Sequence, residues 1–168
     1  VEYRPGPTMA AAERMRITVT GSQTHGAVPW KGVDPIAISS QIITALQTIV
    51  AREVNITQVP AVVTIGSIHG GVRNNIIPEE VVMEGTIRTF NDEVRKDIHD
   101  SIRKKAEMIA SASGATAKVE IFSDIAKVTF NEPSLTDKMV PSLERVYGKE
   151  NVKTVSYTHL TLPTMMSV

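Results

Sequence analysis

The 168-residue chain contains no cysteine, few aromatic side chains, no net charge and no long apolar run. Without cysteine, the chain has neither a disulfide framework nor a thiolate metal site. Its 18 basic residues balance its 18 acidic ones. It therefore lacks the basic surplus of a protein that binds nucleic acid or an anionic membrane surface. No stretch reaches the roughly 18 apolar residues that predict a membrane span. We therefore expect neither nucleic acid nor a membrane as a partner.

The two ends of the chain differ from its middle. The first residues, VEYRPGPTMAA, resemble no signal peptide, and we interpret 1–12 as a linker that enters the domain from elsewhere. From Val155 the chain reads VSYTHLTLPT, which resembles a translated sequencing-library adaptor. We predict that 155–168 is a non-native read-through, and we exclude it from fold and function.

Two kinds of hydrophobic periodicity alternate between these ends. Apolar residues recur at every second position where we predict strands and at helical spacing where we predict helices. The Asp34-Pro35 and Asn91-Asp92 pairs are typical of helix starts, and Gly114 of a helix end. The predicted elements are a strand at 13–20, a helix at 34–53, strands at 61–68 and 79–90, a helix from 91 to 114 and a strand at 116–126.

This order predicts an α+β, ferredoxin-like βαββαβ domain over 13–126. It comprises a four-stranded antiparallel sheet with both helices on one face. In the strand at 79–90, one face carries Val81, Met83 and Ile87, and the opposite face carries Glu84 and Arg88. Arg88 should therefore lie on the open face of the sheet. It is either an ordinary surface arginine or a clamp for an anion, since a guanidinium binds a carboxylate through two parallel hydrogen bonds.

The predicted strand order, 4-1-3-2, places 61–68 at an edge of the sheet. This segment carries no charge and no proline, and such an edge tends to pair with another chain. We therefore expect a twofold homodimer through 61–68 and the helix at 34–53. The alternative is that a loop or a neighbouring domain covers the edge.

The histidines alone do not define a catalytic centre. His25 lies in a glycine-bounded loop, and His69 precedes a Gly-Gly turn. His99 has Lys96, Asp97 and Asp100 as neighbours, so we predict that it lies on a solvated helix face. His159 falls in the predicted read-through. No clustered metal-ligand motif and no GxSxG nucleophile motif is present.

Four stretches taken together resemble a known family. They are GSQTHGAVPWKGVDPI, ALQTIVAR, VVTIGSIHGGVRNNIIP and EGTIRTF. In this order they are similar to the dimerisation (lid) domain of the zinc-dependent aminoacylase and carboxypeptidase family. This group includes hippurate hydrolases, N-acyl-amino-acid amidohydrolases and indoleacetyl-amino-acid hydrolases. The resemblance covers roughly 5–154, and it implies that 127–154 is a partial return to a catalytic domain.

The resemblance also implies an activity and residue roles. The parent would be a cytoplasmic hydrolase that cleaves the amide bond of N-acyl amino acids or small peptides. It would use two zinc or other divalent ions held outside this chain, so the fragment alone is expected to be inactive. His25 would stabilise the oxyanion in the partner subunit's active site. Asn75 and Arg88, with Asn74 ranked second, would hold the substrate's carboxylate, and Gly71 would form the connecting turn. The rival hypothesis is a stand-alone ferredoxin-like module that binds small molecules or mediates assembly without catalysis.

Overall fold

The structure of the chain is a computed structural model that describes residues 1–156, apart from the side chains of Asp124 and Ile125. The predicted read-through therefore lies outside the described residues from position 157 onward. The strands are β1 (Glu2–Tyr3), β2 (Gly6–Met9), β3 (Ala11–Thr20), β4 (Thr24–His25), β5 (Ala61–Gly70), β6 (Ile76–Ile77), β7 (Glu80–Thr89), β8 (Thr116–Ala126), β9 (Thr129–Asn131) and β10 (Lys153–Thr154). The helices are α1 (Pro35–Thr48), α2 (Asp92–Ala112) and α3 (Pro133–Tyr147), with 3-10 turns at Pro29–Lys31 and Lys149–Asn151 and a π-helical turn at Ile49–Glu53.

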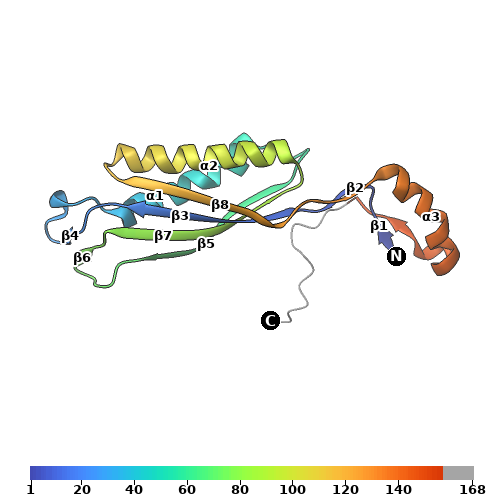
Figure 1. The fold of residues 1–168 in the computed structure, drawn as a ribbon, viewed down its shortest axis with the longest axis horizontal. Coiled ribbons are helices and arrows are strands. Elements are labelled where there is room, and N and C mark those ends of the chain that lie inside the picture. Colours follow the sequence, from blue (N-terminus) through green and yellow to red (C-terminus); the bar gives the residue numbers. More distant parts are fainter. Residues whose placement is uncertain (157–168) are drawn as a thin grey trace.

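The central sheet has the strand order β5-β7-β3-β8, and all neighbouring strands are antiparallel. Helices α1 and α2 lie together on one face of this sheet, and the other face is open (Figure 1). The ferredoxin-like α+β prediction is therefore confirmed, with β5 at an edge. The strands differ slightly from their predicted bounds, since β3 begins at Ala11 and β5 continues to Gly70.

The core lies between the sheet and the two helices. The buried row of each central strand meets aliphatic side chains of both helices, and each such side chain stabilises the fold by about 1.5–3 kcal/mol when fully buried. The opposite rows of β3 and β7 stay largely polar, as the alternation predicts. The buried aliphatic residues are Met15, Ile17, Val19, Val63, Val81, Met83 and Ile87 from the sheet and Ile38, Ile42, Leu46, Ile49, Ile98, Ile102, Ala106 and Ala110 from the helices.

The helix boundaries follow the predicted capping residues. The carboxylate of Asp34 accepts hydrogen bonds from the backbone N–H groups of Ile36 and Ala37 at the start of α1. The side-chain oxygen of Asn91 does the same at the start of α2. Gly114 follows α2 with a φ of 77°, a conformation that costs glycine little because it has no Cβ atom.

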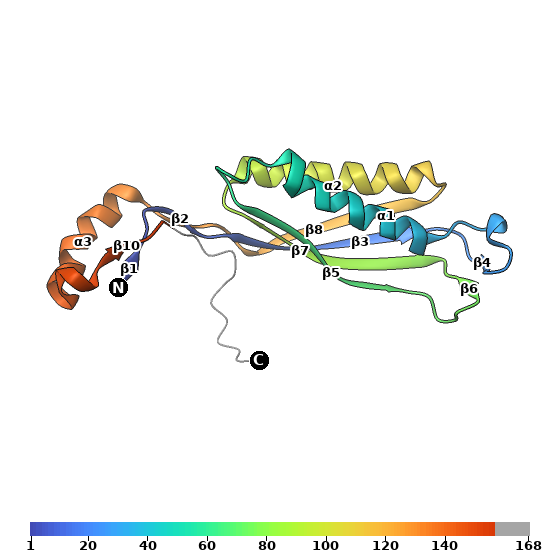
Figure 2. The same ribbon diagram turned by 180° about the vertical axis from the view of Figure 1, so that it is seen from behind.

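A smaller unit lies beyond the base of the sheet, the end at which β3 begins and β8 ends. There β2 pairs antiparallel with β9, and β1 pairs parallel with β10, next to α3 (Figure 2). Pro141 lies inside α3, which continues through it as one helix. In the part of the chain that the structure describes, no helix is long and apolar enough to cross a membrane.

Gly85 of β7 allows two neighbours to approach closely, which makes it a site for testing the sheet. A Cβ atom at Gly85 would lie 2.2 Å from the carbonyl oxygen of Thr64 and 2.6 Å from Cε of Met15. Gly85→Ala should therefore lower the free energy of unfolding by about 1–3 kcal/mol or more, measured by urea denaturation. Gly66→Ala is the matched control, since its Cβ would meet only the Glu84 carbonyl oxygen at 3.9 Å. Equal stability of both variants would contradict this packing.

Candidate functional site

Two segments that lie 50 positions apart in the sequence meet at the tip of the domain, the end opposite the base. β4 and β6 form a two-stranded ribbon in which His25 pairs with Ile76. The backbone N–H of Gly26 donates to the carbonyl oxygen of Asn75 over 2.8 Å. The structure therefore brings the predicted His25 and Asn74-Asn75 segments together, and backbone hydrogen bonds rather than side chains join them.

The ring of His25 is exposed, and one of its nitrogens is already occupied. Nδ1 accepts a hydrogen bond from the backbone N–H of Ala27 over 3.1 Å. Because Nδ1 acts as an acceptor, a neutral imidazole carries its proton on Nε2. The loop therefore presents a hydrogen-bond donor to the outside of the domain, which is the property that an oxyanion-stabilising group needs.

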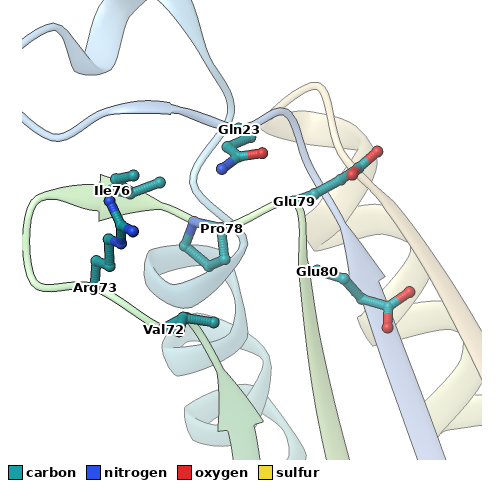
Figure 3. A pocket seen from close by; sticks show the side chains of 8 residues that line it. Gln23, Val72, Arg73, Ile76, Pro78, Glu79 and Glu80 are labelled. Atoms are coloured by element: carbon teal, nitrogen blue, oxygen red, sulfur yellow. The ribbon is translucent and has the colours of Figure 1, made fainter.

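Two cavities flank the loop that joins β5 to β6. One, of about 460 Å³, is lined by Gly26, Gly71 and Asn74 among others, and so includes two of the predicted site residues. The other, of about 450 Å³, is lined by Arg73, Ile76 and Pro78 among others (Figure 3). Gly71 has a φ of 79°, which favours glycine at this turn. Both cavities have the size of a small-molecule site.

Arg88 is half-buried on the open face of the sheet, near the base. Its Nη1 donates to the backbone carbonyl oxygens of Ile87 at 3.0 Å and Glu13 at 3.4 Å, and to the hydroxyl of Thr86. Within the described part of the chain, its Nη2 and Nε have no hydrogen-bond partner, and no carboxylate pairs with the guanidinium. Arg88 is therefore held in place while an edge of its guanidinium remains available to an anion.

Arg88 and Asn75 do not meet within one chain. Arg88 pairs with Ala12 near the end of β7, whereas Glu80, at the other end of β7, lies next to the tip. Eight residues of extended strand separate these positions, about 27 Å at roughly 3.4 Å per residue. A single chain therefore cannot place both side chains on one carboxylate.

The sequence prediction for His99 was wrong. His99 is not on a solvated face, because its side chain is only 14% exposed and its Nε2 lies 2.7 Å from Oε2 of Glu13. Glu13 is itself 1% exposed, on the helix-facing side of β3, and its Oε1 lies 3.6 Å from Nη1 of Arg95. The signal was available in the sequence. Glu13 continues the apolar row of its strand, so its carboxylate had to find a partner in the core.

The environment of Glu13 has opposing effects on its pKa. Burial, the largest effect, raises the pKa, but the hydrogen bond with His99 and the positive charge of Arg95 help to hold it below its ordinary value of 4.5. A lowered folded-state pKa means that the ionised carboxylate stabilises the fold above pH 4.5, and that this contribution is lost as the pH falls through the lowered value.

Glu13→Gln should therefore lower the free energy of unfolding at pH 7 by about 1–3 kcal/mol. It should also reduce the loss of stability that the unaltered chain shows below pH 4.5. Urea denaturation between pH 3 and pH 7 measures both effects, with the exposed Glu107→Gln variant on α2 as the control. The same pH dependence in Glu13→Gln and the unaltered chain would show that this carboxylate does not control acid stability.

The family resemblance implies metal ligands that lie outside this chain. Among the described residues, no group of three or more histidine, aspartate or glutamate side chains is close enough to hold a metal ion. The pair of Glu13 and His99 is joined by an arginine rather than by a third ligand, which does not suit a cation. The candidate site residues therefore offer hydrogen-bond donors and a positive charge.

Comparison with known proteins agrees with this geometry. Residues 12–113, more than half of the chain, match the family described as the peptidase dimerisation domain of the M20 group. The chain belongs to this M20 peptidase dimerisation domain family.

Its relatives are hydrolases. The chain is 38% identical over 143 residues to thermostable carboxypeptidase 2 of Saccharolobus solfataricus, covering 85% of this chain and 36% of the relative. It is 44% identical over 120 residues to the N-acetyl-L-cysteine deacetylase of Bacillus subtilis, covering 71% and 29% respectively. The crystal structure of a dinuclear metal-binding M20 peptidase of Bacillus subtilis superimposes with a TM-score of 0.71 at 29% identity, covering 94% of this chain and 37% of that one. The chain spans about a third of the length of these relatives.

Proposed function

We propose that this domain serves a metal-dependent amidohydrolase that cleaves the amide bond of N-acyl amino acids or small peptides. In this proposal the domain joins two subunits and supplies residues to their active sites, and the chain alone has no hydrolase activity. The observation that supports it most directly is the placement of His25 and Arg88 at opposite ends of one sheet. Family membership and hydrolase relatives support it over a stand-alone binding module.

The proposed dimer interface consists of β5 and α1. β5 is an edge strand within this chain, and it contains no charged residue that would discourage pairing. The two helices also differ in their content of charged residues. α1 has no charged residue from Pro35 to Thr48, whereas α2 carries charges along its exposed face. An exposed helix face of small, uncharged residues such as Ser40 and Thr44 suits close packing against a second copy.

A twofold axis through β5 would bring the separated residues together. When a strand pairs antiparallel with its own copy, the first residue of one copy lies beside the last residue of the other. Ala61, at the base, would then approach Gly70 of the partner subunit, at the partner's tip. Arg88 lies on the strand next to β5, opposite Val62. Each base would therefore face a tip that carries His25 and Asn75.

These positions suggest a division of labour between subunits. Arg88 pairs with Ala12, close to the point where β3 connects to the smaller unit, and we assign it to the substrate carboxylate in its own subunit. His25 and Asn75, with Asn74 and Gly71 in the same loop, would serve the partner's site. There the Nε2–H of His25 would donate to the oxygen on which negative charge develops during amide cleavage. The amide group of Asn75 would donate to the bound substrate.

Thr44→Arg tests the interface on the chain itself. We expect the unaltered chain to be a dimer at micromolar concentration. Thr44→Arg should shift it to monomers, because two arginines would face each other near the twofold axis. Light scattering coupled to size-exclusion chromatography measures the mass. Glu107→Arg, which changes an exposed position on α2, is the matched control and should leave a dimer. A monomeric unaltered chain would contradict the proposed assembly.

Mixed subunits of the complete enzyme test the division of labour. His25→Ala should mainly lower kcat, by about 100-fold or more, and Arg88→Ala should mainly raise KM. When the two impaired variants are dissociated and reassembled together, half of the dimers are mixed, and each mixed dimer has one intact site. At a substrate concentration far below the KM of Arg88→Ala, where both variants are nearly inactive alone, activity towards an N-acyl amino acid should therefore return to about a quarter of the unaltered level.

Two other outcomes would have a clear meaning. If mixing restores no activity, His25 and Arg88 act on the same subunit's site and the exchange across the interface is wrong. If neither single variant changes kcat or KM, both residues are structural. A mixture of two His25→Ala preparations carrying different tags is the control for reassembly, and it should remain inactive.

A further inference from the structure

A cavity of about 400 Å³ lies at the base of the sheet, between the start of α2 and the segment that follows β8. No residue of the candidate site lines it. Its volume falls within the range of small-molecule sites. It is lined by Phe90, Asp92, Arg95, Lys127, Val128 and Phe130.

The lining carries more positive than negative charge. Arg95 is shared between two carboxylates, because its Nη2 lies 3.1 Å from Oδ1 of Asp92 and its Nη1 lies 3.6 Å from Oε1 of Glu13. Lys127 makes no ion pair or hydrogen bond with any residue whose side chain the structure describes. Among the described side chains, Lys127 is therefore the unpaired cation of the cavity lining, which also contains the 27% exposed guanidinium of Arg95.

The rest of the lining is mainly apolar, and part of this apolar surface is exposed to solvent. Phe90 is buried at 8% exposure, but Phe130 on β9 is 59% exposed. An exposed phenylalanine at the mouth of a cavity gains stability when an apolar group removes its surface from water. The buried Oε1 of Glu13, on the far side of Arg95, has no hydrogen-bond partner in the described part of the chain.

We propose that this cavity binds a small carboxylate that carries an aromatic or branched apolar body. Its carboxylate would pair with Lys127, with the positive charge of Arg95 nearby in the lining, and its body would lie against Phe130 and Phe90. Such a ligand would contact both the start of α2 and the β8–β9 connection, and so link the sheet to the smaller unit. The proposal does not depend on the hydrolase function proposed above, since every residue it uses lies in this chain.

The test is a titration of the purified chain with benzoate, followed by two-dimensional amide NMR. Two further probes each lack one half of the ligand: acetate has the charge without the ring, and benzyl alcohol has the ring without the charge. Benzoate should cause saturable shifts at Arg95, Lys127 and Phe130, and it should bind at least about tenfold more tightly than either probe.

Substitutions identify the site. Lys127→Gln and Phe130→Ala should each weaken benzoate binding about tenfold. Lys31→Gln, which removes an exposed lysine at the tip, should leave it unchanged. Both tested side chains lie at the surface, and a dispersed spectrum of each variant shows that it folds.

Several results would overturn the proposal. Among them are the absence of saturation with benzoate, equal binding of all three probes, and unchanged binding by Lys127→Gln. Shifts confined to the loop at 70–78 would also overturn it, because benzoate would then occupy the tip cavities of the candidate site. Loss of the mixed-subunit activity described above leaves this proposal unaffected, so the two proposals can fail separately.

Discussion

The continuous antiparallel pairing of β3 with β7 is the constraint on which the rest of this structure depends. It runs from Ala11 opposite Thr89 to Thr20 opposite Glu80 without a register shift. A slip of one residue would turn every side chain to the other face, which would expose the row of Met15, Ile17 and Val19 and bury Arg14 and Arg16. The same register sets the two ends of the domain, because the tip loops follow Thr20 and precede Glu80, and the base begins at Ala11 and Thr89.

The two ends are built differently. At the tip, backbone hydrogen bonds and close glycine contacts hold short loops that leave their side chains exposed. At the base, side-chain interactions connect the elements. Glu13 joins β3 to α2 through His99 and Arg95, while its backbone carbonyl accepts hydrogen bonds from Thr86 and Arg88. The tip is thus suited to reach another molecule, and the base to hold an arginine in a fixed position.

The arginines on the open face of the sheet differ in whether another side chain of this chain already engages them. On the open face, Arg16 is paired with Glu84 at 2.6 Å, and the guanidinium of Arg14 lies 4.6 Å from the centre of the Phe122 ring. These two arginines are engaged within the chain, whereas Arg88 has no carboxylate partner among the described residues. An arginine that is already paired has less to offer a ligand. The structure therefore distinguishes an anion clamp from an ordinary surface arginine at position 88 better than the sequence position does.

Local patterns in the sequence were sufficient for most of the fold. The period of two in β3 and β7, the caps at Asp34 and Asn91 and the stop at Gly114 all act over a few residues, so they could be recognised without any tertiary information. The strand at 116–126 was predicted with its observed bounds.

The sequence by itself determined the order of elements, the buried faces, the family resemblance and the segments that hold His25, Asn75 and Arg88. Tertiary structure decided which of these residues meet. It joined His25 to the Asn75 turn through β4 and β6, and it separated both from Arg88 by the length of β7. It also paired Glu13 with His99, 86 positions away. Such contacts depend on how strands and helices assemble in space, and no periodicity within a short segment records them.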